Sequence, residues 1–325
     1  MVKAIILFLV GFVLLIKGGD WFVDGAVGIA KRYHIPEILI GATVVSIGTT
    51  IPEVMVSSIA AAVGQSQTAY GNAIGSVICN TALISAITLA AKPFADVDTR
   101  TFKTPVIFFF VAAVFYAAVA YTSGTFTRVI GIILLAIFVI YMTITIRQAF
   151  SGKLVLEPEE EDEGEKKESP LWKDILYLVI GAAVIAVGAK LLVDNGKIIA
   201  AGFGVPESVI ALTFIALGTS LPELVTAITS LVKGHSALSL GNVVGANLFN
   251  LVLVSGMAIT INPFSIPADK LIAGRNASLV VDLPLMFFVM AFMTVPALCT
   301  KKVRRYQGVI LLLLYAAYVT FQFFL

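Results

Sequence analysis

The chain has 325 residues, of which 59% are hydrophobic and only 13% are charged, and its mean hydropathy is +0.99. A soluble domain carries about 25% charged residues, so this composition excludes the ordinary soluble classes and indicates an integral membrane protein. The formal net charge of +2, without any block of basic residues, gives no sign of a nucleic-acid partner. We therefore expect the chain to lie in a lipid bilayer.

Ten apolar stretches are long enough to span a hydrocarbon core about 30 Å thick. The first, at residues 3–30, carries Lys17, Asp20 and Asp24 on one helical face, which predicts a local ion pair near a membrane surface and not a cleaved signal peptide. Gly, Pro, Asn or Ser residues mark most of the joints between stretches. The other nine stretches lie at about 37–63, 71–91, 104–122, 127–148, 171–199, 207–232, 238–261, 279–298 and 306–324.

The distribution of Lys and Arg among the loops predicts the orientation in the membrane. With the N-terminus outside, the inside loops hold 15 of the 22 basic residues and the outside loops hold five. Because short cytoplasmic loops are enriched in Lys and Arg, this bias predicts that both termini lie outside. The acidic run from Glu157 to Glu168 then belongs to a cytoplasmic linker, residues 151–170, which we expect to be a solvated loop.

Many residues of the first half recur in the second half at a constant offset of 170 positions. The alignment needs no gap over more than eighty residues, from Gly11 to Phe94. Chance does not produce such agreement, and the period is far too long for a solenoid. The matched pairs include Gly11 and Gly181, Gly18 and Gly188, Pro52-Glu53 and Pro222-Glu223, Gly71-Asn72 and Gly241-Asn242, and Asn80 and Asn250.

Five predicted spans separate equivalent positions, so the two halves are expected to insert with opposite orientations. This predicts an all-α integral membrane protein with ten transmembrane helices in two inverted-topology five-helix repeats. The first repeat is residues 1–150 with its signature at 43–85, and the second is residues 171–325 with its signature at 213–255. Inverted repeats characterise secondary transporters, whose binding sites lie near the membrane midplane where Gly/Pro-interrupted helices meet. The sequence therefore predicts a transporter.

The segments G-T-T-I-P-E at 48–53 and G-T-S-L-P-E at 218–223 place a carboxylate and a proline inside apolar stretches. An ionisable residue at the bilayer centre costs about 2.5–3.5 kcal/mol, so we expect both glutamates to be functional. Each proline removes a backbone N–H and is expected to break its helix and to free carbonyl oxygens. A structural pair of protonated carboxyls is the alternative, but it does not explain the adjacent breaks.

The next span of each half adds further oxygen atoms. Ser76 and Asn80 are four residues apart on one helical face, and Ala246 and Asn250 occupy the equivalent positions. The glycines of this signature, Gly71, Gly75, Gly241 and Gly245, are interpreted as points of close helix approach. Asn72 and Asn242 are interpreted as hydrogen-bonding residues between helices.

Carboxylates, hydroxyls, amides and carbonyls form a set of hard oxygen ligands. Such ligands suit Ca²⁺ or Na⁺ and do not suit a softer metal that prefers His or Cys. Glu53 and Glu223 together supply two negative charges, and their own spans contain no Lys or Arg. One Ca²⁺ or two Na⁺ would neutralise them, which gives a physical basis for competition and exchange.

With both signatures at one fixed offset, the sequence resembles the sodium/calcium exchanger family, within the Ca²⁺:cation antiporter superfamily, over nearly the whole chain. The resemblance implies that the second, third, seventh and eighth helices form the site, while the first and sixth slide across it. It implies that Glu53 and Glu223 are the charged metal ligands. The other implied cation ligands are the side chains of Thr49, Thr50, Ser76, Asn80, Thr219, Ser220 and Asn250 and the backbone carbonyls of Ser46 and Ala216.

The sequence departs from the family pattern at three positions. Thr50 stands where a Ser is common and keeps the hydroxyl. Ala246 lacks the hydroxyl that Ser76 provides in the first half, and Asn250 stands where some members carry an Asp. The two halves are therefore expected to differ as ligand donors, which bears on ion stoichiometry.

The predicted function is exchange of Na⁺ for Ca²⁺ across the cell inner or plasma membrane by alternating access. The ions are substrates, so we expect no cofactor, and neither nucleic acid nor an obligatory protein partner is indicated. An H⁺-driven cation antiporter is the alternative, because the two glutamates could carry H⁺, and a channel of the same fold would lack coupling. An enzyme is not expected, because the two histidines, His34 and His235, have no Ser or Cys partner at a recognisable spacing.

Overall fold

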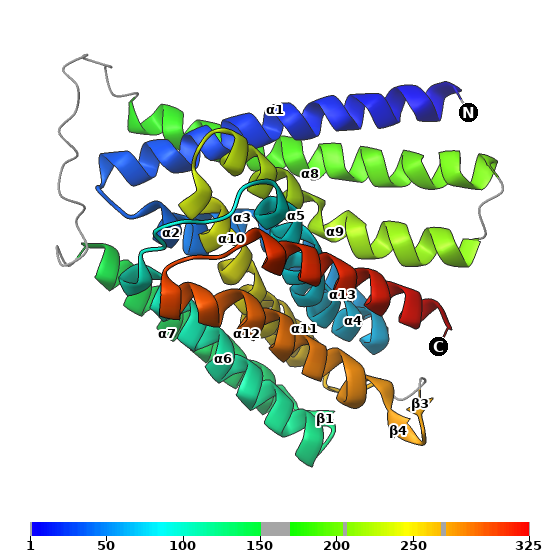
Figure 1. Ribbon diagram of the computed structural model, residues 1–325. Helices are drawn as coiled ribbons and strands as arrows, with labels where there is room; N and C mark the ends of the chain where they lie inside the picture. Colours follow the sequence, from blue (N-terminus) through cyan, green and yellow to red (C-terminus); the bar gives the residue numbers. More distant parts are fainter. Residues whose placement is uncertain (1, 151–169, 204–206, 268–270, 325) are drawn as a thin grey trace. The chain divides into compact units, whose positions relative to one another are not determined.

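The computed structural model describes residues 2–150, 170–203, 207–267 and 271–324, and the side chains of residues 207–217, 323 and 324 are not part of that description. Within these ranges the chain is nearly all helical (Figure 1). The predicted all-α class is confirmed at this level, with four two-residue strands as the exception. The acidic run Glu157–Glu168 lies outside the described residues.

The elements follow in chain order, and 20 residues separate the end of α7 from the start of α8. The helices are α1 Val2–Arg32, α2 Glu37–Ile40, α3 Ser46–Ala62, α4 Ser66–Cys79, α5 Ala86–Ala91, α6 Thr99–Thr122, α7 Arg128–Phe150, α8 Leu171–Gly202, α9 Glu207–Val232, α10 Ser236–Phe249, α11 Ser255–Ile261, α12 Leu283–Thr300 and α13 Arg305–Phe324. The π-helical segments are η1 Gly41–Val45, η2 Asn80–Ser85, η3 Asn250–Val254 and η4 Ser278–Asp282. The strands are β1 Thr125–Phe126, β2 Phe264–Ser265, β3 Leu271–Ile272 and β4 Arg275–Asn276.

Eight helical stretches of the described chain are long and apolar enough to cross a membrane. They coincide with eight of the predicted spans, and some combine several elements, as Glu37–Ala62 combines α2, η1 and α3. The two other predicted spans, at 207–232 and 306–324, are helical as α9 and α13. The protein is therefore a multi-pass membrane protein, while the number of ten crossings stays a prediction.

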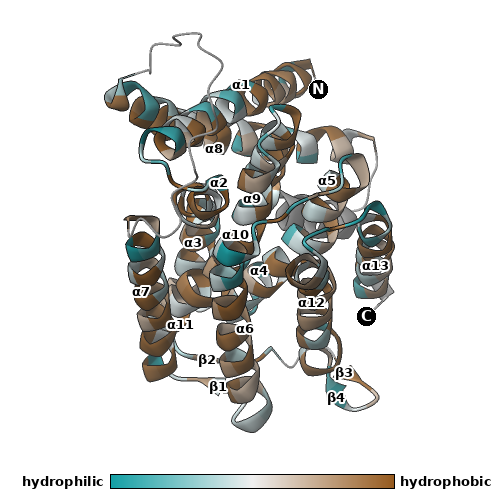
Figure 2. Cartoon of the chain, turned by 60° about the vertical axis from the view of Figure 1, so that its left-hand side comes forward, coloured by the Kyte–Doolittle hydropathy of each residue, from teal (hydrophilic) through white to brown (hydrophobic). Residues whose placement is uncertain are grey.

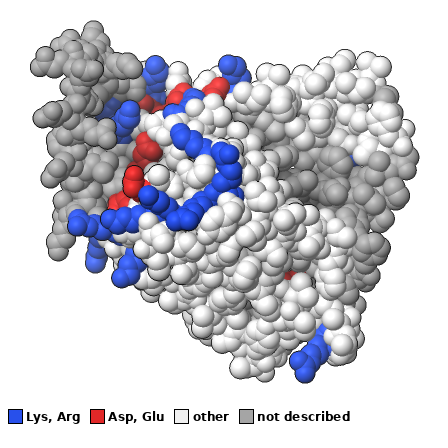
Figure 3. Space-filling view, in the orientation of Figure 1, with Lys and Arg blue, Asp and Glu red and all other residues white. Residues whose placement is uncertain are grey.

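The surface of the long helices has the character expected in lipid. Figure 2 shows hydrophobic residues along most of their length. Val187 and Leu313 expose 53% and 66% of their surface, although both are large and apolar. Charged side chains gather in limited parts of the face shown in Figure 3, and most of that face carries none. A soluble protein seldom exposes such wide apolar patches.

Contacts divide the chain into two compact units, and each unit combines segments of both sequence halves. Unit 1 is Met1–Thr49 with Ile144–Asn242, and unit 2 is Thr50–Thr143 with Val243–Leu325. The boundaries fall within α3, α7 and α10. The predicted division into residues 1–150 and 171–325 concerns repeated sequence and not packing, and it stays a prediction.

In unit 1, α1 lies along α8, as Figure 1 shows, and glycines bring the two backbones close together. A Cβ atom added to Gly11 would lie 2.8 Å from the carbonyl oxygen of Gly188, and one added to Gly188 would lie 2.9 Å from the carbonyl oxygen of Gly11. A Cβ at Gly18 would lie 2.8 Å from the backbone nitrogen of Ile185. Helices α1 and α8 occupy equivalent positions in the two repeats, and they pack closely at Gly11, Gly18 and Gly188. The offset of 170 pairs Gly11 with Gly181 and Gly18 with Gly188.

Replacing Gly188 with Leu is expected to destabilise the protein, because the new side chain would meet the backbone of α1. Forcing extra atoms into a packed interior typically costs about 1–3 kcal/mol. Thermal unfolding of the purified protein in detergent measures the effect. Val187→Leu is the matched control, since Val187 is exposed and should tolerate the change. Equal unfolding temperatures for Gly188→Leu and the wild type would contradict the packing described.

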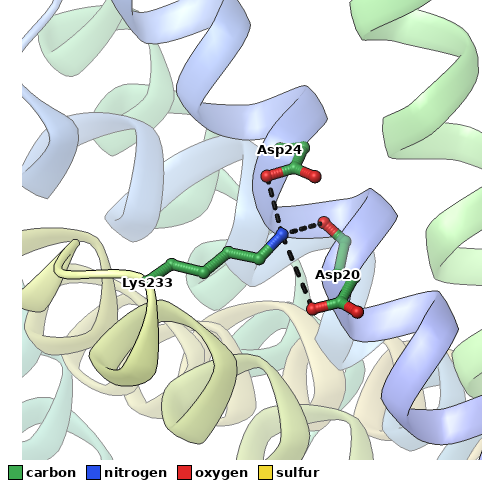
Figure 4. A network of polar contacts seen from close by, with 3 residues as sticks. All are labelled: Asp20, Asp24 and Lys233. Atoms are coloured by element: carbon green, nitrogen blue, oxygen red, sulfur yellow. Dashed lines mark hydrogen bonds and ion pairs between the residues drawn. The ribbon is translucent and has the colours of Figure 1, made fainter.

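A polar network in unit 1 joins α1 to the turn after α9. The Nζ atom of Lys233 lies 2.7 Å from Oδ1 of Asp24, 3.5 Å from Oδ1 of Asp20 and 3.1 Å from the Asp20 carbonyl oxygen (Figure 4). The sequence predicted a local ion pair on α1 that included Lys17. The structure corrects this: the partner of both aspartates is Lys233 in the turn after α9, because the i, i+4 spacing aims the two carboxylates at one neighbour.

Replacing Lys233 with Met is expected to lower the free energy of unfolding by no more than about 1 kcal/mol. The side chains of Lys233, Asp20 and Asp24 are 27%, 36% and 51% exposed, so water already screens the charges. Methionine keeps the apolar part of the lysine stem. Chemical or thermal unfolding at low and high salt measures the difference. A loss above about 3 kcal/mol, typical of a broken buried ion pair, would be the contrary result.

In unit 2, α4, η2 and η3 lie in the interior, where they contact α6, α12 and α13. The ring centroid of Phe249 lies 5.1 Å from that of Phe138 and 6.0 Å from that of Tyr141. A buried hydrogen bond of 2.7 Å runs from Nδ2 of Asn247 to Oγ1 of Thr81. The strands β1 and β2 pair in antiparallel fashion, with Thr125 opposite Ser265. Aromatic packing and buried polar contacts thus fix the helices that carry the site residues of this unit.

Candidate functional site

Unit 1 carries Ser46 and Thr49 on α3 and Ser220 and Glu223 on α9, and each of the four exposes at most 2% of its surface. Thr219, one residue earlier, is half-buried. Both carboxylate oxygens of Glu223 and the hydroxyl of Ser220 have no hydrogen-bond partner among the described residues. Burying an ionised carboxylate is costly unless a charge or a proton compensates it. Glu223 therefore marks a place suited to a positively charged species.

The Thr49 hydroxyl belongs to a cluster of oxygen atoms near the start of α3. Its oxygen is 3.3 Å from Oδ1 of Asn242 and 3.4 Å from the carbonyl oxygen of Ser46. The Ser46 hydroxyl makes a shorter bond of 2.7 Å to the carbonyl oxygen of Gly41, at the start of η1. Hydroxyl, carbonyl and amide oxygens thus lie close together in the unit that also carries Glu223.

Unit 2 carries Thr50 and Glu53 on α3, Ser76 on α4, Asn80 at the start of η2 and Asn250 at the start of η3. These five residues expose at most 3% of their surface. Among the described residues, the Thr50 hydroxyl, both amide atoms of Asn80 and Oδ1 of Asn250 have no hydrogen-bond partner. The Nδ2 atom of Asn250 donates to the carbonyl oxygen of Ala246 at 3.1 Å, which directs the amide oxygen elsewhere. Three of these four atoms are oxygens, so this unit also presents buried oxygen atoms without a hydrogen-bond partner among the described residues.

Asn72 and Asn242 hydrogen-bond between helices, as the sequence indicated. The Nδ2 atom of Asn72 donates to Oγ of Ser57 at 2.9 Å and to the carbonyl oxygen of Glu53 at 3.3 Å. The Oδ1 atom of Asn242 accepts from hydroxyls of α3 instead. Both asparagines therefore hold α3, but one acts as a donor and the other as an acceptor.

The π-helical segments at the site were not expected from the sequence. Both η2 and η3 begin at a predicted ligand, Asn80 and Asn250, at positions that the offset of 170 relates. A π-turn displaces the backbone hydrogen bonds by one residue and is frequent at functional sites. Side-chain hydroxyls satisfy carbonyls there: Ser255 donates to the Asn250 carbonyl oxygen at 3.0 Å, and Ser85 donates to that of Thr81. The recurrence of Asn and Ser five residues apart was the available signal.

The expected helix breaks at the two prolines are not present. Helix α3 continues through Pro52, and α9 continues through Pro222. Each proline still removes a donor four residues after Gly48 or Gly218, but the flanking turns keep the helix intact. In the first half the irregular backbone lies earlier, in η1, which precedes α3. The prediction of broken helices at the prolines was therefore wrong, and the irregularity belongs to the π-helical segments.

The signature glycines differ in their surroundings. A Cβ atom added to Gly241 would contact the carbonyl oxygen of Ile38, so this glycine allows close approach of α10 to α2, as predicted. For Gly71 and Gly75, no described atom lies within 4 Å of the added Cβ. Close packing at these two positions stays a prediction.

The predicted ligands are thus buried in two sets, Ser46, Thr49, Ser220 and Glu223 in one unit and Thr50, Glu53, Ser76, Asn80 and Asn250 in the other. Ala216 lies in α9 among the residues whose side chains are outside the description, and the role of its carbonyl stays a prediction. So does the common site of Glu53 and Glu223.

Comparisons with known proteins agree over the whole length. The family described as "Sodium/calcium exchanger protein" matches residues 3–147 and 173–324. The chain is 34% identical to CaxA of Alkalimonas amylolytica, named as a candidate antiporter, with 98% of both chains covered. It is 29% identical to the sodium/calcium exchanger MaX1 of Methanosarcina acetivorans, again over 98% of both chains.

A solved structure gives the same result for the fold. The sodium-calcium exchanger NCX_Mj, soaked with Na⁺ and Sr²⁺, superposes with a TM-score of 0.81 and 28% identity over 98% of both chains. That structure is described as showing mechanisms of extracellular ion exchange and induced occlusion of the binding site. Family, relatives and fold agree, and the chain belongs to the sodium/calcium exchanger family, a family of membrane antiporters.

Proposed function

We propose that this protein exchanges Na⁺ for Ca²⁺ across the cell membrane by alternating access. The observation that carries the proposal is the burial of Glu53 and Glu223, each fully buried within an apolar helix and each preceded by two hydroxyl residues. Their positions are related by the offset of 170 that relates the two halves. Carboxylate and hydroxyl oxygens are ligands for Ca²⁺ and Na⁺.

Charge supports exchange of these ions. Two carboxylates bring two negative charges, which one Ca²⁺ or two Na⁺ neutralise, and a third Na⁺ would leave one positive charge. Binding of the two kinds of ion is then mutually exclusive at the same carboxylates. The proposed ligands beyond the glutamates are Ser46, Thr49, Thr50, Ser76, Asn80, Ala216, Thr219, Ser220 and Asn250.

The proposed architecture is ten transmembrane helices in two inverted repeats, with both termini outside and the acidic linker in the cytoplasm. An inverted repeat supports alternating access, because the two halves can exchange conformations and so turn an outward-open state into an inward-open one. The ions are the substrates, and the proposal needs neither a cofactor nor a protein partner.

The second candidate is an H⁺-driven cation antiporter, favoured by the same two buried carboxyls, which could exchange protons. Proteoliposomes loaded with Na⁺ are expected to accumulate radiolabelled Ca²⁺ when they are diluted into Na⁺-free buffer at equal pH. Ca²⁺ uptake driven by a pH gradient in the absence of Na⁺ would show that transport is coupled to H⁺ and not to Na⁺. Ca²⁺ movement that needs no counter-ion would indicate a channel and would overturn both.

A further inference from the structure

Asn242 is not itself a proposed ligand, but its side chain contacts one, Thr49. It is fully buried on α10, and its Oδ1 atom lies 3.3 Å from the hydroxyl oxygen of Thr49. Thr49 is itself a proposed ligand, and it belongs to the same compact unit as Glu223. The three side chains come from α10, α3 and α9 and belong to one compact unit. The contact that carries the inference therefore joins Asn242 to Thr49.

A threonine hydroxyl has one proton and two lone pairs, and its rotor decides where each points. To bind a cation, the Thr49 oxygen must turn its lone pairs toward the ion and its proton away from it. The proton then needs another acceptor. The Ser46 carbonyl oxygen is within 3.4 Å, but this carbonyl is itself a proposed ligand. The Oδ1 atom of Asn242 is the neighbouring acceptor that the proposed site does not use.

The other hydroxyl near Asn242 does not compete strongly for the amide oxygen. The Ser46 hydroxyl is 3.3 Å from Oδ1 of Asn242, but only 2.7 Å from the Gly41 carbonyl oxygen. The Ser46 hydroxyl therefore donates its proton to the Gly41 carbonyl oxygen. The Asn242 oxygen stays available to Thr49.

The equivalent asparagine of the first half has a different role, and the sequence explains why. Asn72 uses its Nδ2 atom to donate to the hydroxyl of Ser57. The position equivalent to Ser57 is Ala227, which is buried and has no acceptor on its side chain. The Nδ2 atom of Asn242 accordingly has no hydrogen-bond partner among the described residues. Because Ala227 has no hydroxyl, the Asn242 side chain makes its hydrogen bonds as an acceptor, through Oδ1.

We propose that Asn242 is a positioning residue for cation binding: its amide oxygen accepts the Thr49 proton and so turns the lone pairs of Thr49 toward the cation held by Glu223. This inference rests on the proposed function. It assigns Asn242 no direct contact with the ion. Its effect must therefore pass through the Thr49 hydroxyl and disappear when that hydroxyl is absent.

A double-mutant cycle on the purified full chain, with Ca²⁺ binding as the readout, tests this path. Asn242→Leu, which is close in size and lacks the acceptor, is expected to weaken Ca²⁺ binding about tenfold, the loss of one hydrogen bond to a charged site. In a Thr49→Val background the same change is expected to weaken binding less than about twofold. In a Ser46→Ala background the tenfold loss is expected to remain.

An equal loss in the Thr49→Val and wild-type backgrounds would overturn the inference, because a merely structural role of Asn242 would not depend on Thr49. Unfolding temperatures without Ca²⁺ show whether each variant is folded, and Asn242→Ala replaces Asn242→Leu where the larger residue prevents folding. Absence of Ca²⁺ binding by the wild-type protein would refute the proposed function itself. The two failures are therefore distinguishable.

Discussion

Replacing Glu223 with Gln is expected to reduce Na⁺-driven Ca²⁺ uptake at least about 100-fold, which corresponds to about 3 kcal/mol. The substitution keeps the size of the side chain and removes one of the two negative charges proposed to hold the ion. Ca²⁺ would then carry one uncompensated positive charge into a buried place. The initial rate of radiolabelled Ca²⁺ uptake into Na⁺-loaded proteoliposomes measures the loss. Glu53→Gln is expected to have the same effect.

The matched control is Asp194→Asn on α8. Asp194 pairs with Lys190 at 2.9 Å, and their side chains are 52% and 78% exposed. Removing this carboxylate changes the net charge of the protein by the same amount, and uptake should stay near the wild-type rate. Full uptake by Glu223→Gln would show that the buried carboxylate is not a ligand. Equal losses in Asp194→Asn and Glu223→Gln would point to a general charge effect instead.

Replacing Asn80 with Leu is expected to weaken ion binding while leaving the protein at least as stable as the wild type. Both amide atoms of Asn80 are buried without a hydrogen-bond partner among the described residues, so an apolar side chain of similar shape removes a desolvation cost. As a proposed ligand, its oxygen should contribute directly to the ion. We expect an affinity loss of about tenfold or more for Ca²⁺, from titration, together with an unchanged or raised unfolding temperature.

Asn262→Leu, in the same unit, is the control, because it is expected to change stability and not Ca²⁺ affinity. The Nδ2 atom of Asn262 donates to the Ala61 carbonyl oxygen at 3.0 Å, so its loss should lower the free energy of unfolding by about 1 kcal/mol and leave Ca²⁺ affinity unchanged. If Asn80→Leu lowered stability and left affinity intact, Asn80 would be a structural residue.

The sequence was most informative where a repeated pattern constrained the chemistry. A Glu and a Pro repeated at one offset drew attention to two carboxylates inside apolar stretches, where an ionisable residue is costly, and both are fully buried. The helical stretches followed from apolar length alone. The same local pattern could not give the π-turns at Asn80 and Asn250, since an extra residue per turn leaves composition and hydrophobicity unchanged.

Contacts between distant segments were also beyond the sequence. The three charges on α1 predicted a local pair, but the partner of Asp20 and Asp24 is Lys233, which only the fold brings near. The prolines suggested broken helices, but the described backbone stays helical through Pro52 in α3 and Pro222 in α9. The opposite roles of Asn72 and Asn242 depend on which hydroxyl each one meets, and that became visible only with the helices in place.

The most direct test of the central claim is to measure both ions in the same proteoliposomes. Vesicles loaded with ²²Na⁺ are diluted into Na⁺-free buffer with and without Ca²⁺, and Na⁺ release and Ca²⁺ uptake are followed together. Exchange predicts that Na⁺ leaves only while Ca²⁺ enters, and that Glu223→Gln stops both fluxes. Na⁺ release at the same rate with and without external Ca²⁺ would contradict coupled exchange.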